Sequence, residues 1–155
     1  ISNNRSLSRL AAVQTLFQYD FNEKMKLQEL KSINDLEISE IYETIKNLNN
    51  GISEFKGLNL DKDWFLILVN SVFNNRNKID NILSDFLSDD WSIERMDQTI
   101  INILRCAYIE FKDFSKIPPK VIISEYTNIA ASFFDRTEVN FINGVLDKVS
   151  SSLRT

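Results

Sequence analysis

Apolar residues recur at three- and four-residue spacing along much of the chain, which is the pattern of amphipathic α-helices. The clearest segment is residues 97–111, DQTIINILRCAYIEF, where one apolar face is complete and further apolar residues occupy the other sides. A helix that is apolar almost all round has to be surrounded by other helices. We therefore expect residues 97–111 to form the central helix of a helical domain.

Three polar residues interrupt this apolar segment: Asn102, Arg105 and Glu110. Buried polar groups need hydrogen-bond partners. Because Arg105 and Glu110 point in different directions from the helix, we expect each to pair with a different helix and to be structural. Cys106 lies in the same segment, and we expect it to be a small buried residue and not a reactive thiol.

Helical periodicity also marks the segments on either side. A first helix is predicted to begin at a cap formed by Ser6, and a second to span residues 38–48. Residues 64–87 contain neither glycine nor proline and predict helix, broken near Asn74–Asn75. The apolar positions of the first helix are expected to be Leu7, Leu10, Val13, Phe17 and Phe21.

After this segment, Trp91 is available to pack beneath the central helix. Pro119 suits the first turn of the next helix, whose apolar side runs to Phe133, and Thr137 is expected to cap the last helix, whose stripe runs to Leu153. No hairpin signal is present. The sequence predicts an all-α fold, with a single compact domain of about seven helices over residues 1–155.

The chain contains no histidine and one cysteine. This removes histidine-based catalysis, histidine metal ligands and a structural zinc site. The three glycines form no phosphate-binding loop. We expect a protein that is not an enzyme, with no catalytic residues, no cofactor and no metal. No apolar run is long enough to span a membrane, and the lone cysteine fits the cytoplasm.

The net charge of −4 argues against strong nonspecific binding to nucleic acid, which depends on neutralising phosphates. The charge is unevenly distributed along the chain. Acidic residues gather on the approach to the central helix, at Asp85, Asp89, Asp90, Glu94 and Asp97, and three lysines follow it, at Lys112, Lys116 and Lys120.

In the last helix, Phe141 falls at the edge of the apolar stripe, close to Gly144 and Lys148. It is either an ordinary residue at the rim of the core or a flat surface for a nucleobase. A glycine inside a helix costs about 1 kcal/mol relative to alanine, and close approach of a backbone or ligand is the usual reason to keep one. Arg5 and Arg9 by themselves are typical of a solvated helix surface.

Four segments, SRLAAVQTLFQYDF, ERMDQTIINILRCAYIEF, IPPKVIISEY and NFINGVLDKV, resemble in this order the family of the transcription antitermination factor NusB. The resemblance covers nearly the whole chain and is most specific at residues 95–110 and 141–147. It implies a small all-helical domain that binds boxA-type single-stranded RNA of ribosomal RNA leaders. It also implies two partners, the ribosomal protein NusE and the transcription elongation complex.

Carried over by position, the resemblance implies six RNA-binding residues: Arg5, Arg9, Gln14, Phe17, Lys120 and Phe141. The acidic stretch is a plausible docking face for basic NusE, with Asp89, Asp90 and Glu94 as charges and Phe86 and Leu87 as apolar anchors. Two alternatives stay open. One is a protein-only ribosome-assembly adaptor. The other is a domain related to that of ribosomal RNA cytosine methyltransferases, which would need a further catalytic domain that we do not expect in 155 residues.

Overall fold

The structure is a computed structural model and describes residues 4–26, 60–88 and 90–154. These residues form six α-helices and one short 3-10 helix, and they contain no strand, which confirms the all-α prediction and lies close to the predicted seven helices. The helix predicted at residues 38–48 lies outside the described residues. The chain divides into two compact units, residues 1–74 and 75–155, and the prediction of a single domain stays a prediction.

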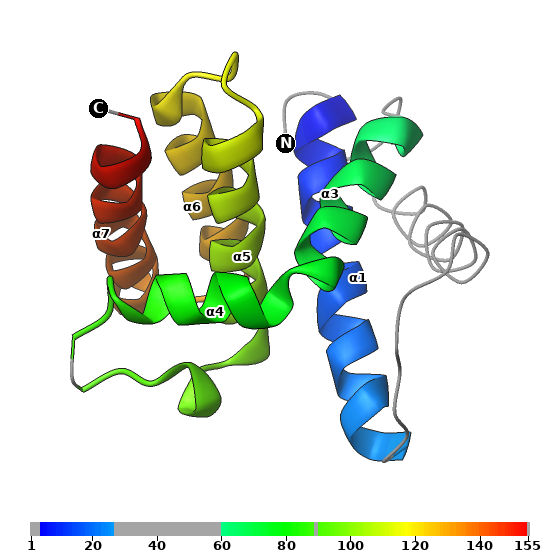
Figure 1. Cartoon of the computed structure of the whole chain (residues 1–155), viewed down its shortest axis with the longest axis horizontal. Coiled ribbons are helices and arrows are strands. Elements are labelled where there is room, and N and C mark those ends of the chain that lie inside the picture. Colours follow the sequence, from blue (N-terminus) through cyan, green and yellow to red (C-terminus); the bar gives the residue numbers. More distant parts are fainter. Residues whose placement is uncertain (1–3, 27–59, 89, 155) are drawn as a thin grey trace. The chain divides into compact units, whose positions relative to one another are not determined.

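In the first unit, α1 (Asn4–Lys26) packs against α3 (Lys62–Asn74) (Figure 1). The two helices bury apolar faces, and Tyr19 of α1 meets Phe73 of α3 edge to face, with ring centroids 4.9 Å apart. The buried apolar residues of this unit include Leu7, Leu10, Ala11, Val13, Leu16, Phe65, Leu68, Val69 and Val72.

Two details of α1 correct the sequence analysis. The helix begins at Asn4, so Ser6 lies inside its first turn, is buried and is not the cap. Phe17 is 38% exposed, whereas Leu16 is buried. The buried stripe continues from Val13 by a step of three residues and not four, which leaves Phe17 on the outer side.

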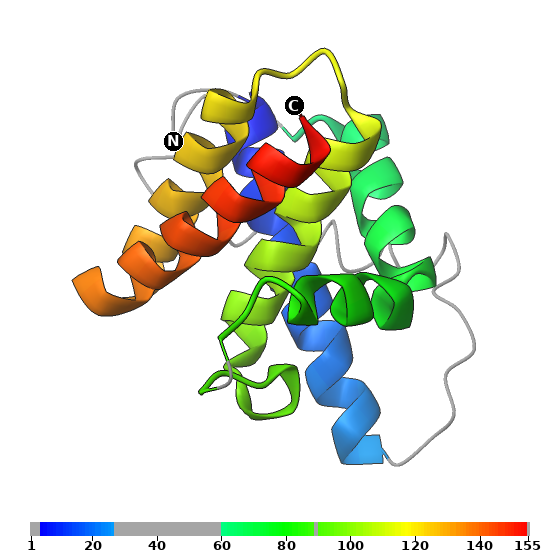
Figure 2. The same ribbon diagram turned by 60° about the vertical axis from the view of Figure 1, so that its left-hand side comes forward.

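The long glycine-free segment breaks where it was predicted to break. Helix α3 ends at Asn74, and α4 (Arg76–Ser84) begins two residues later. In the second unit, α4 buries Ile79 and Leu83 and packs against α5 (Gln98–Asp113). It crosses α5 in both views (Figure 1, Figure 2).

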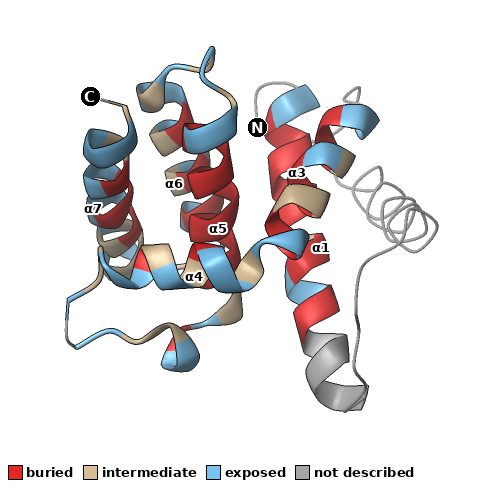
Figure 3. Ribbon diagram, in the orientation of Figure 1, coloured by how far each residue is buried: buried red, intermediate tan, exposed pale blue. Residues whose placement is uncertain are grey.

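Helices α5, α6 (Pro119–Phe133) and α7 (Arg136–Leu153) pack against one another and alternate in direction (Figure 1). Their connections are short, which favours antiparallel neighbours. Every residue of 100–111 is buried (Figure 3). Asp97 caps α5, since its Oδ1 accepts hydrogen bonds from the backbone N–H groups of Thr99 (2.7 Å) and Ile100 (3.4 Å). The prediction of a buried central helix is confirmed.

The ends of the last two helices differ in part from expectation. Helix α6 begins at Pro119, as predicted. Helix α7 begins at Arg136 after Asp135, so Thr137 lies within the first turn and does not cap it. Phe133 and Leu153, predicted to lie on buried stripes, are exposed because they stand in the last turns of their helices, beyond the packed part.

Arg154 forms hydrogen bonds with backbone carbonyl groups at the C-terminal end of α5 and in the connection that follows. Its Nε donates to the carbonyl of Phe111 (2.7 Å), its Nη2 to that of Phe114 (3.0 Å) and its Nη1 to that of Ile117 (3.0 Å). Carbonyl groups at a helix C-terminus have no partner within the helix, and a cation there also interacts favourably with the helix dipole. This contact ties the end of the chain to the α5–α6 connection. None of the helices in the described ranges combines the length and apolar character that crossing a membrane requires.

Candidate functional site

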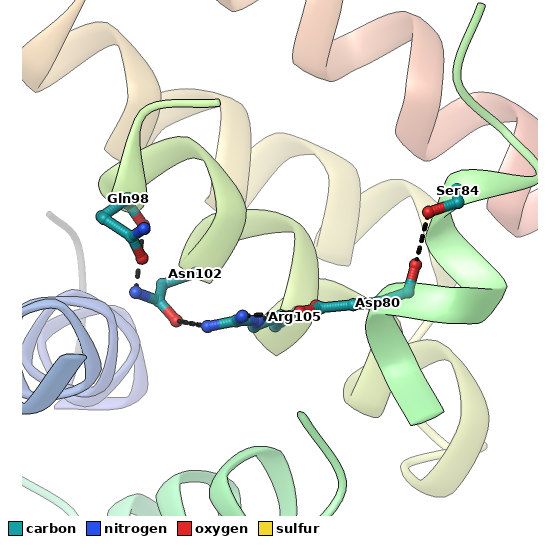
Figure 4. A network of polar contacts seen from close by, with 5 residues as sticks. All are labelled: Asp80, Ser84, Gln98, Asn102 and Arg105. Carbon is teal, nitrogen blue, oxygen red and sulfur yellow. Dashed lines mark hydrogen bonds and ion pairs between the residues drawn. The ribbon is translucent and has the colours of Figure 1, made fainter. Parts of the chain in front are cut away.

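The polar residues of α5 are paired inside the second unit. Nε and Nη2 of Arg105 donate to the two carboxylate oxygens of Asp80 on α4, at 2.8 and 2.7 Å (Figure 4). Nη1 of Arg105 donates to Oδ1 of Asn102 (3.0 Å), and Nδ2 of Asn102 donates to the Gln98 carbonyl (3.0 Å). A bidentate pairing of arginine with a carboxylate is strong and directional. The network joins α4 to α5 and is structural.

Glu110 pairs with a different helix, as predicted. The hydroxyl of Tyr126 on α6 donates to Oε2 of Glu110, and both residues are fully buried. Cys106 is also fully buried, and this burial raises the pKa of its thiol far above the usual range, with the Glu110 carboxylate adding to the effect. A thiol that stays protonated is a poor nucleophile, so Cys106 is not a reactive thiol, as predicted.

The second unit has an aromatic pair on its surface. Trp91 stacks on Phe141 of α7, with ring centroids 4.2 Å apart and ring planes inclined by 26°. Trp91 is 42% exposed and Phe141 is half-buried. From the sequence, Trp91 was considered available to pack beneath the central helix. The structure shows its ring stacked on α7, just before the 3-10 helix η2 (Ile93–Arg95), and contact with α5 stays a prediction. The pair leaves aromatic surface in contact with solvent.

The surface of α7 beside this pair is open. Gly144 and Lys148, one and two turns after Phe141, are both exposed. A Cβ atom added at Gly144 would meet no atom within 4 Å among the described parts of the chain. Close approach by another backbone of those parts therefore does not explain this glycine, and approach by a ligand stays a prediction.

The first unit holds a cluster of two arginines and one indole. The guanidinium carbons of Arg5 and Arg9 lie 5.6 and 5.0 Å from the ring centroid of Trp64 on α3. Such cation–π contacts are attractive and favour a fixed placement of the guanidinium. Arg5 is exposed, whereas Arg9 is only 2% exposed. The two arginines are brought together, but only Arg5 is accessible to a ligand in this structure.

The other predicted RNA-binding residues are spread over both units. Gln14 is half-buried and Phe17 exposed on α1. Lys120 is exposed in the first turn of α6. Four of the six residues thus belong to the first unit and two, Lys120 and Phe141, to the second, so the convergence of all six on one face stays a prediction.

The predicted partner-binding stretch lies between α4 and α5. Phe86 and Leu87 are half-buried, and Asp90 and Glu94 are exposed. Oε2 of Glu94 accepts a hydrogen bond from the hydroxyl of Ser92 (2.8 Å). Asp89 lies outside the described residues. The described part of the stretch exposes acidic groups beside partly covered apolar ones.

Sequence reasoning missed the two tryptophans. Trp64 was noted only as the first residue of the predicted helical segment 64–87, and Trp91 only as available to pack beneath the central helix. Each tryptophan meets partners 50 or more residues away along the chain, so no local spacing indicated the contact. The described residues also contain no group of three metal-ligating side chains that could hold an ion.

Comparison with known proteins identifies the family of this chain. The sequence model of the NusB family matches residues 6–151. The chain belongs to the NusB family. The transcription antitermination protein NusB of Rhizobium leguminosarum bv. trifolii is 34% identical over 153 residues, which cover 99% of this chain and 89% of that protein. NusB of Allorhizobium ampelinum is 35% identical with the same coverage.

Solved structures of the family have the same fold. The NusB structure from T. maritima superposes with a TM-score of 0.75 at 25% identity, over 100% of this chain and 96% of that chain. A NusB chain crystallised with NusE and double-stranded RNA superposes with a TM-score of 0.71 at 20% identity, over 98% and 99% of the two chains. At this identity the second likeness speaks to the fold of the NusB family alone.

Proposed function

We propose that this protein is an RNA-binding transcription antitermination factor of ribosomal RNA synthesis. It binds boxA-type single-stranded RNA together with NusE and acts in the cytoplasm as part of a transcription elongation complex. It is an adaptor and not an enzyme. Its contribution is to hold an RNA segment and a protein partner at the same time.

The family relationship carries this proposal. The relatives named as transcription antitermination proteins align over 99% of the chain, and the chain spans 89% of their length. The relationship therefore concerns the whole domain and not one shared motif. The structure that was solved with NusE and double-stranded RNA supports the fold, and its RNA is a reason to compare single-stranded with double-stranded RNA in the test.

Exposed and half-buried side chains suit single-stranded RNA. Arg5 and Lys120 offer positive charge for phosphates, Gln14 offers an amide for a base edge, and Phe17 and the stacked pair of Phe141 with Trp91 offer aromatic surface for unstacked bases. Arg9 is only 2% exposed and lies against the same Trp64 ring as Arg5, so its contribution is to position this ring. These contacts are few for a chain of net charge −4, so a basic partner that adds positive surface would strengthen RNA binding.

The test measures the affinity for a short boxA-type single-stranded RNA by fluorescence anisotropy, with and without NusE and at several salt concentrations. We expect the NusE complex to bind more tightly than either protein alone, with an affinity that falls as salt rises. The same sequence as a duplex should bind more weakly. If NusE binds and no RNA binds under any condition, the protein-only adaptor is the correct function.

The partner surface can be tested separately. Changing Asp90 and Glu94 to lysine should slow association with NusE, because complementary charge mainly raises association rates. The matched control changes Asp63 and Asp113 to lysine, two other exposed acidic residues, which alters the net charge by the same amount. Equal association rates for the two double variants at low salt would place the docking surface elsewhere.

A further inference from the structure

We propose that Trp91 is the base-stacking residue of the RNA site, with Phe141 as the ring that supports it. An unpaired nucleobase stacks on the exposed face of the Trp91 indole, while the opposite face lies on Phe141. This inference rests on the proposed function, and it assigns the more exposed ring of the aromatic pair to RNA.

The geometry of the pair favours Trp91, and not Phe141, as the ring that contacts the base. The two rings are stacked, with centroids 4.2 Å apart and planes inclined by 26°, so the face of Phe141 that meets Trp91 is already covered. A base could use that face only by displacing the indole. Trp91 is the more exposed ring of the two, and an indole offers the larger stacking surface.

The exposure of Trp91 contrasts with that of the other tryptophan. Trp64 is 6% exposed, whereas Trp91 is 42% exposed. Burying a large aromatic side chain is strongly favourable, so an indole left in solvent is an informative feature. The indole is also held in place, because the backbone N–H of Trp91 closes a turn onto the Ser88 carbonyl (3.0 Å) and the ring rests on a residue of a long helix.

The surroundings favour a base over a phosphate at this position. Asp90 precedes Trp91 and is exposed, so a phosphate directly at the indole would be repelled. The face of a neutral base carries no such penalty. On α7, the open surface at Gly144 leaves room for a sugar, and exposed Lys148 supplies a cation.

A protein partner is the competing occupant. Tryptophan is frequent among residues that dominate protein interfaces, and Trp91 lies within the stretch proposed to dock NusE. The two occupants differ in what they require. Stacking needs an aromatic ring, whereas an apolar anchor tolerates an aliphatic side chain of similar reach.

The experiment labels the protein with 5-fluorotryptophan and follows the two ¹⁹F signals during titration with boxA-type RNA and, separately, with NusE. A Trp91→Phe variant assigns the signal of Trp91. We expect this signal to shift on addition of RNA to the NusE complex. The affinity of Trp91→Ala and Trp91→Leu for RNA should fall about 5- to 150-fold, and Trp91→Phe should retain most of it.

Thermal unfolding of each variant shows that a loss of RNA binding does not reflect loss of the fold. Parent-like RNA affinity of folded Trp91→Leu overturns the inference and leaves the proposed function standing. RNA binding by the parent protein without a shift of the Trp91 signal also overturns the inference. A shift caused by NusE alone, with weakened NusE binding in Trp91→Ala only, would make Trp91 a docking residue and also overturn it. If the parent complex binds no RNA, the proposed function fails as well.

Discussion

Arg105 and Arg5 carry the same guanidinium group in opposite surroundings. Arg105 is largely buried and makes a bidentate ion pair with the Asp80 carboxylate. Arg5 is exposed and lies over the uncharged ring of Trp64, and the structure shows no ion pair for it within the described residues. The first arginine has its charge neutralised by the fold, and the second has its position fixed while its charge stays available.

This difference separates residues that hold the fold from residues that bind a ligand. A buried ion pair satisfies both charges and leaves nothing for a partner, and removing one member exposes the other to an apolar environment. An indole attracts a cation without cancelling its charge. The same division applies to the aromatic rings, because Tyr126 is buried against Glu110 whereas Trp91 faces solvent.

The largest expected effect is on stability. Replacing Arg105 with alanine should lower the free energy of unfolding by about 3–5 kcal/mol, because Asp80 and Asn102 lose their shared partner. Urea unfolding measures the change. The double variant Arg105→Ala with Asp80→Ala should recover part of the loss, since it leaves no unpaired carboxylate. A loss below about 1 kcal/mol would show that this pair behaves like an exposed surface pair.

Leu104 tests the apolar part of the same helix. Its side chain is fully buried in α5, so Leu104→Ala should cost about 2–5 kcal/mol through the cavity that remains. Urea unfolding again gives the change. Leu153→Ala, at an exposed position of α7, is the matched control and should have a small effect. Similar losses in both variants would mean that α5 is no better packed than the end of α7.

The buried helix α5 and the candidate site also differ in how far they could be predicted from the sequence. The burial of α5 followed from its own spacing, because apolar residues on all sides leave a helix no exposed face. That Arg105 and Glu110 would pair with different helices also followed from spacing. The identity of the partners did not, because Asp80 and Tyr126 lie on separate helices whose packing no local pattern encodes.

The candidate site was predicted mainly through the family resemblance. Phe141 was placed at the edge of its stripe from periodicity, and it is half-buried. Its contact with Trp91 depends on the path of the connection between α4 and α5, where no periodic pattern applies. Periodicity alone placed Phe17 on the apolar stripe, because steps of three and four residues fit a helical stripe equally well and packing against α3 decides between them.

Gly144→Ala should change the free energy of unfolding by less than the Arg105 and Leu104 variants, and should raise it. The position is exposed within α7 and has room for a Cβ, so the change should stabilise the protein by about 1 kcal/mol through helix propensity. If RNA approaches the backbone there, its affinity should fall in the same variant. The control is Ser151→Ala, an exposed position on the same helix further from Phe141. Unchanged RNA affinity in Gly144→Ala would place the RNA away from this part of α7.

The smallest expected effect separates the two arginines beside Trp64. Each phosphate contact with single-stranded nucleic acid contributes about 0.7 to the slope of log K against log salt. Arg5→Gln should lower that slope by about this amount and leave the unfolding free energy nearly unchanged, because Arg5 is exposed. Arg9→Gln should leave the slope unchanged and reduce stability, because Arg9 is 2% exposed and its guanidinium lies against the indole. Salt titrations of RNA binding and urea unfolding of both variants give the two quantities. A reduced slope in Arg9→Gln alone would mean that Arg9 leaves the indole to reach the phosphate, and the distinction between neutralised and available arginines would then fail at this site.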